Sequence, residues 1–111
     1  MCRALKVLCA ALTADRLAEL KRATVSVHWE LVGGATSLSE LLLQVQAERP
    51  DVVVVHSGLG AEAVTAVRRL DQGVRIVGVG GLPGADETAD SVHRVREAIL
   101  GLPSPGGPVR R

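Results

Sequence analysis

The sequence is almost without aromatic side chains: it has one tryptophan, Trp29, and no phenylalanine or tyrosine. A hydrophobic core must therefore be built from valine, leucine and alanine, and 47% of the 111 residues are apolar. A surface that stacks nucleic-acid bases on aromatic rings is excluded on the same ground. The charges nearly cancel, with thirteen basic and twelve acidic residues, so there is no broad basic face for DNA. We expect no direct contact between this domain and nucleic acid.

Cysteines are few, and secretion signals and membrane-length apolar runs are absent. Cys2 and Cys9 are the only cysteines, and no further metal ligands follow them at a recognisable spacing. The N-terminus lacks the long apolar segment of a secretion signal, and no apolar run is long enough to cross a bilayer. We therefore expect a reduced cytoplasmic protein with two structural thiols and with no membrane association, metal or cofactor. A disulfide or metal clip between the two cysteines is the minor alternative.

Apolar runs and amphipathic segments alternate along the chain. The predicted strands cover about residues 5–11, 24–32, 51–55 and 74–79, and the predicted helices cover about 14–23, 38–48, 61–71 and 92–100. In the second strand Val25, Val27, Trp29 and Leu31 recur at period two, and Gly33-Gly34 is expected to end it. Trp29 is expected to pack in the core because no other aromatic residue is available.

Strand–helix alternation with short connections favours a parallel sheet with right-handed crossovers and helices on both faces. We expect residues 1–102 to form a doubly wound, flavodoxin-like α/β sandwich of three layers with strand order 2-1-3-4. A fifth strand joins the sheet only if residues 85–90 supply it. Residues 103–111 are rich in proline and glycine and are expected to form a disordered tail or linker. Functional residues in such folds lie at the carboxyl ends of the strands.

One segment resembles a known family. RPDVVVVHSGLG, residues 49–60, resembles the third strand of response-regulator receiver domains, in which a Pro-Asp pair opens the strand. LKVLCAALTADRLAEL resembles the first strand and helix, GGATSLSELL the start of the second helix, VRIVGVGG the fourth strand and SVHRVREAILG the last helix. The resemblance covers about residues 4–101. It implies a receiver-like fold and a role in signal transduction.

The resemblance also implies where phosphorylation chemistry would lie, and those positions carry unsuitable residues. The two metal-binding acids of the family correspond to Ala11 and Leu12, its phosphate-accepting aspartate to His56, and the hydroxyl residue ending its fourth strand to Gly80. Two apolar residues cannot hold a hard divalent cation. The segment between the fourth strand and the last helix is short, so we expect a shortened fourth helix and fifth strand. The chain thus resembles a degenerate receiver, or pseudo-receiver.

Residues at the carboxyl ends of the strands are candidates for contact with a ligand or partner: His56, Ser57, Gly58, Gly80 and Gly81. The unperturbed pKa of histidine lies near neutrality, so His56 is also a candidate proton switch. The sequence around Ser57 lacks the first glycine of a nucleophile elbow, because Val55 stands there. The glycine-rich segment 78–84 fails the dinucleotide pattern, because Pro83 occupies the place of the third glycine. We therefore expect no enzymatic activity.

These observations predict a non-catalytic regulatory domain that acts through protein–protein interaction or dimerisation, independently of aspartate phosphorylation. The alternative is a small-ligand sensor that binds at the carboxyl ends of the strands. We also expect a weak homodimer, because the fourth strand would be an exposed edge. The candidate dimer face comprises Arg75, Val92, Val95 and Ile99. A monomer in which residues 82–90 fold over that edge is the alternative.

Overall fold

Five parallel strands form one sheet in the order β2-β1-β3-β4-β5 in a computed structural model that describes residues 5–101. The strands are β1 (Leu5–Ala10), β2 (Trp29–Ala35), β3 (Val52–His56), β4 (Arg75–Val79) and β5 (Glu87–Ala89). The helices are α1 (Ala14–Thr24), α2 (Leu38–Glu48), α3 (Ala61–Leu70) and α4 (Val95–Leu100), with the short 3-10 turns η1 (Ser57–Leu59) and η2 (Val92–Arg94). The predicted doubly wound sandwich and strand order are confirmed. The expectations for Cys2 and for the 103–111 tail lie outside the described residues.

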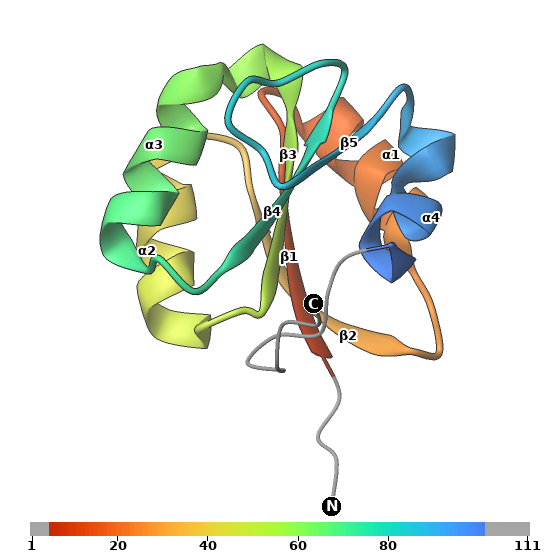
Figure 1. Cartoon of the computed structure of the whole chain (residues 1–111), viewed down its shortest axis with the longest axis horizontal. Coiled ribbons are helices and arrows are strands. Elements are labelled where there is room, and N and C mark those ends of the chain that lie inside the picture. The colour runs from red at the N-terminus through yellow and green to blue at the C-terminus, as the bar shows by residue number, and fades with distance from the viewer. Residues whose placement is uncertain (1–4, 102–111) are drawn as a thin grey trace, which may run out of the picture.

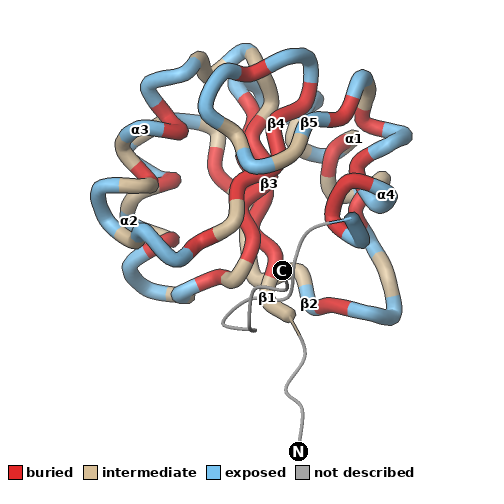
Figure 2. The backbone as a smooth tube through the Cα atoms, viewed as in Figure 1, coloured by how far each residue is buried: buried red, intermediate tan, exposed pale blue. Residues whose placement is uncertain are grey.

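Helices cover both faces of the sheet, with α2 and α3 on one side and α1 and α4 on the other (Figure 1). Alternate residues of the central strands β1 and β3 point to opposite faces. Val7 and Val54 belong to the core beneath α1 and α4, whereas Leu8 and Val53 belong to the core beneath α2. Figure 2 shows the buried backbone concentrated in these strands. The buried runs that predicted central strands therefore lie at the centre of the sheet.

The second strand begins later than the alternation of its valines predicts. Helix α1 continues to Thr24, whose carbonyl accepts a 2.7 Å hydrogen bond from the indole Nε1 of Trp29. Val25 and Val27 lie in the connection, and the Val27 side chain is 98% exposed. Trp29 is buried, as predicted. The indole thus closes the end of α1 and sets the point where β2 starts.

Gly33 and Gly34 lie inside β2, so the prediction that they end the strand is wrong. The Gln44 side chain of α2 crosses one face of the strand, and its Nε2 donates to the Gly34 carbonyl over 2.6 Å. A Cβ on Gly33 would overlap Gln44, and a Cβ on Gly34 would lie 2.5 Å from Lys21 Cε of α1. The two glycines therefore allow long polar side chains from both helix layers to lie against the edge strand.

No helix separates β4 from β5 in the described chain, and β5 has only three residues. This agrees with the expected shortening. β5 pairs with β4 through Val77, Gly78 and Val79, so β4 is not the exposed edge that the dimer expectation required.

The candidate dimer face is likewise corrected. Val92, Val95 and Ile99 belong to the core beneath α1 and α4, where Val95 is fully buried. Arg75 opens β4, and its backbone N–H donates to the Asp51 carbonyl over 3.0 Å. The apolar stripe of the last helix packs inward because η2 and α4 cover the sheet beside α1. These three side chains are therefore not available to a second copy.

Candidate functional site

The carboxyl ends of β1, β3 and β4 bring the predicted site residues together. Val55 pairs with Ala10, and His56 pairs with Val79. The residues that follow these strands, Ala11 and Gly80, consequently flank the end of β3. Parallel pairing alone produces this clustering, because all strands end at one edge of the sheet.

His56 caps the short turn that follows β3. Its ring Nδ1 accepts a 3.2 Å hydrogen bond from the backbone N–H of Gly58. Burial lowers the pKa of His56 from its ordinary value, the positive charge of Arg16 lowers it further, and Glu19 acts in the opposite direction. The ring is therefore neutral at neutral pH, with its proton on Nε2. The imidazole accepts a backbone hydrogen bond and does not take the part of the phosphate-accepting carboxylate that the family carries at this position.

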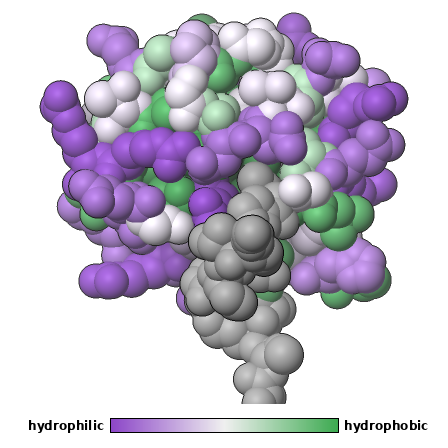
Figure 3. All heavy atoms as spheres, in the orientation of Figure 1, coloured by the Kyte–Doolittle hydropathy of each residue, from purple (hydrophilic) through white to green (hydrophobic). Residues whose placement is uncertain are grey.

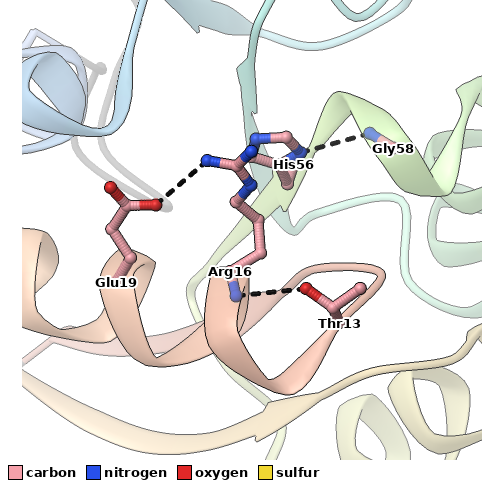
Figure 4. A network of polar contacts seen from close by, with 5 residues as sticks. All are labelled: Thr13, Arg16, Glu19, His56 and Gly58. Atoms are coloured by element: carbon pink, nitrogen blue, oxygen red, sulfur yellow. Dashed lines mark hydrogen bonds and ion pairs between the residues drawn. The ribbon is translucent and has the colours of Figure 1, made fainter.

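Arg16 and Glu19 belong to this site, and neither is among the residues that the sequence predicted. Thr13 caps α1 by accepting a 3.2 Å hydrogen bond from the Arg16 backbone N–H. The first turn of α1 lies near the end of β3, since the charges of Arg16 and Glu19 act on the His56 ring. The Arg16 guanidinium lies next to the His56 ring and pairs with the Glu19 carboxylate at 3.1 Å (Figure 4). The i,i+3 spacing indicates the ion pair. It gives no sign that the pair faces the third strand.

The residues at the metal positions of the receiver pattern do not fit Mg²⁺. Ala11 is completely buried, and the Leu12 side chain is 57% exposed. Neither side chain has an oxygen atom, and a hard divalent cation requires several oxygen ligands. Within residues 5–101, no three His, Cys, Asp or Glu side chains gather in a way that would hold a metal ion.

Gly80 stands at the position of the family's hydroxyl residue, and its backbone and its neighbour Ser57 disfavour a larger side chain there. It has a φ of 91°, and a Cβ there would lie 2.7 Å from the Ser57 Oγ. A serine or threonine at this position would be strained by the left-handed backbone, and the Ser57 hydroxyl would have to move to admit its Cβ. Gly81 also has a positive φ, of 82°, and its Cβ position is open. Ser57 thus occupies the space that a side chain at position 80 would need.

A separate hollow of about 350 Å³ lies between the C-terminal ends of α2 and α3, at the opposite end of the sheet. Its lining residues are Val45, Gln46, Arg49, Leu70 and Asp71. None of them is among the site residues that the sequence predicted. Within residues 5–101, every helix is too short or too polar to span a bilayer.

Comparisons with known proteins support the fold through structure and not through sequence. No family model and no curated protein matches the chain. The receiver domain of the putative response regulator NarL from Mycobacterium tuberculosis superposes with a TM-score of 0.73 at 19% identity, over 89% of this chain and 95% of that one. The response regulator domain of Thermotoga maritima CheB superposes with a TM-score of 0.69 at 18% identity. The superposition covers 91% of this chain and 100% of that one. A chain of the CheX–CheY–BeF3–Mg complex from Borrelia burgdorferi superposes with a TM-score of 0.71 at 13% identity. The superposition covers 86% of this chain and 87% of that one. The chain therefore has the fold of response-regulator receiver domains.

Proposed function

We propose that this chain is a non-catalytic regulatory domain of the cytoplasm that signals by binding another protein, without phosphorylation of an aspartate. The observation that carries the proposal is the composition of its carboxyl edge. The receiver positions for metal and phosphate hold Ala11, Leu12 and a neutral His56. Acyl phosphate formation requires a carboxylate nucleophile and a bound cation, and these three residues supply neither.

Treatment with a small phosphodonor tests the first half of the proposal. The full chain is incubated with acetyl phosphate and Mg²⁺, and its intact mass is measured beside that of an authentic receiver domain as the positive control. We expect the control to gain a phosphoryl group and this chain to keep its mass. A phosphoryl group found on an aspartate would overturn the proposal, and one found on His56 would show that the family's acceptor position still takes phosphate. A His56→Asn variant treated in parallel identifies that residue as the acceptor if its mass does not change.

Protein contact is supported by one structural neighbour, and the surface limits the kind of contact expected. The neighbour from Borrelia burgdorferi is part of a complex between CheX and CheY. Large apolar side chains are exposed on the described part of this chain: Leu12, Val25, Val27, Leu43, Leu70 and Leu100. On the face shown in Figure 3, apolar atoms are scattered among hydrophilic ones. A scattered distribution marks no large apolar interface on this face, so any contact made there should be small and weak.

Self-association is the simplest form of such contact. Sedimentation velocity at several concentrations measures it, and we expect the mean sedimentation coefficient to rise with concentration. A single monomeric species at the highest soluble concentration would exclude self-association. The proposed partner would then be a different protein, and the result of the phosphodonor test would not be affected.

A further inference from the structure

The turn after β3 lies across the ends of two neighbouring strands. The Ser57 Oγ fills the space above Gly80 at the end of β4. Gly58 lies against Leu12, with the Leu12 Cβ 3.4 Å from the position of a Cβ on that glycine. The Gly60 N–H donates to the Ser57 carbonyl over 2.9 Å and closes the turn. Residues 57–60 therefore contact the chain that follows β1 and the chain that follows β4.

A single imidazole lone pair holds the start of this turn. The Gly58 N–H donates to Nδ1 of His56, which accepts only while that nitrogen is unprotonated. Protonation converts Nδ1 into a donor that faces another donor. The hydrogen bond is then lost, and the Gly58 N–H is left without this acceptor.

The charges around the ring oppose its protonation. On α1, the Arg16 guanidinium faces the ring, and Glu19 partly neutralises it through their 3.1 Å ion pair (Figure 4). On the neighbouring strands, β4 pairs Val79 with His56 and β1 ends at Ala10 opposite Val55, and neither residue is ionisable. Burial acts in the same direction as Arg16, and the pKa of His56 is lowered accordingly. The neutral ring is thus the form that the folded site favours near pH 7.

We infer that His56 makes the turn of residues 57–60 a proton-sensitive switch at the carboxyl edge. The neutral ring holds Gly58 against Leu12 and keeps Ser57 above Gly80. The protonated ring releases Gly58 and frees the turn to rearrange. The inference concerns the same edge as the proposed function, but it rests on these contacts alone and needs no partner.

Nuclear magnetic resonance of the ¹⁵N-labelled full chain between pH 8 and pH 5 tests the inference. We expect the His56 ring to titrate with a midpoint below the ordinary 6.5. The exchange protection of the Gly58 and Gly60 amides, relative to unstructured rates, should fall at the same midpoint. Protection is the decisive measurement, because it follows hydrogen bonding, whereas a chemical shift also follows the nearby charge. A His56 that titrates while both amides keep their protection would overturn the inference.

Three variants complete the test. His56→Asn keeps a side-chain acceptor two residues before Gly58 but cannot titrate, so its turn should stay protected throughout. Arg16→Gln should raise the midpoint of His56 and of the Gly58 exchange together. Arg22→Gln, on the same helix, should leave both unchanged. Equal midpoints in the two arginine variants, or loss of protection at acid pH in His56→Asn, would contradict the inference. The phosphodonor experiment is independent of each result.

Discussion

Arg68 of α3 and Asp86 form a 3.0 Å ion pair that holds the connection between β4 and β5. Arg68 Nη2 also donates to the Gly84 carbonyl over 3.0 Å, and the Asp86 carboxylate accepts the Ile76 N–H over 2.8 Å. Arg68 thus binds the backbone of the connection, and Asp86 joins the connection to β4. Leu82 of this segment is buried beside α3 as a result.

Arg68→Ala should lower the free energy of unfolding by about 1–3 kcal/mol, because it removes a partly buried ion pair and a charged hydrogen bond together. Exposed ion pairs contribute less, but the side chains of Arg68 and Asp86 are only 33% and 24% exposed. Urea unfolding measures the change. Arg69→Ala, at the next position of the helix, is the matched control and should stay within about 0.5 kcal/mol of the parent. Equal effects of the two substitutions would show that the ion pair does not hold the connection.

Val95→Ala and Val27→Ala remove the same atoms from opposite environments. Val95 of α4 is fully buried against the sheet, whereas Val27 is 98% exposed. We expect Val95→Ala to cost about 2 kcal/mol of unfolding free energy, through lost burial and the cavity that remains. Val27→Ala should change it by less than about 0.5 kcal/mol. Denaturant titration of both variants checks this. A large effect of Val27→Ala at high concentration only would instead identify Val27 as a contact between copies.

The Cys9 thiol should be unreactive in the folded protein. Burial raises the pKa of Cys9 to about 11, against smaller lowering effects of Thr24 and Lys21. At pH 8 roughly one thiol in a thousand is then ionised, and the thiolate is the reactive form. In a Cys2→Ser variant, a thiol reagent should modify Cys9 only after urea is added. Rapid labelling without denaturant would show that β1 opens readily.

Acid should reduce the stability of the parent more than that of His56→Asn. Folding lowers the pKa of His56 below its ordinary 6.5, so near this pH the unfolded chain binds more protons than the folded chain. The contribution of His56 to the unfolding free energy is therefore complete above pH 6.5 and is lost as the pH falls toward the folded pKa. Urea unfolding of both proteins at pH 7.5 and pH 5 gives the difference. The comparison cancels other groups such as Glu40, whose pKa is lowered by its hydrogen bonds to Thr36. An identical pH dependence of the two proteins would contradict the prediction.

The central strands were predictable because their composition allows one interpretation. Val52 to Val55 form a β-branched run that is buried on both faces, which a parallel central strand requires. The edge strand β2 was less predictable, because its alternation began on Val25 and Val27, which are exposed. The hydrogen bond from Trp29 to the Thr24 carbonyl decides where β2 starts. The hydrophobic periodicity of the sequence does not reveal such a contact.

The site was predictable in part for a related reason. Parallel strands end at one edge of their sheet, and this rule is enough to place Ala11, His56 and Gly80 together from the order of the strands. The position of Arg16 beside His56 depends on how α1 crosses the sheet, which sequence spacing does not give. The candidate dimer face was wrong because it assumed that β4 is an exposed edge. The three residues of β5 pair with β4 along that edge. So short and acidic a segment gave only a weak strand signal.

The contact between Ser57 and Gly80 has a consequence for protein engineering. Installing phosphate chemistry here is not a matter of replacing His56 by aspartate. A hydroxyl residue at position 80 would require a left-handed backbone and the space that Ser57 now fills. An acid at position 11 would enter a completely buried site. An exchange at position 56 alone would therefore leave positions 11 and 80 unsuited to the chemistry, and each of them needs its own change of packing or backbone.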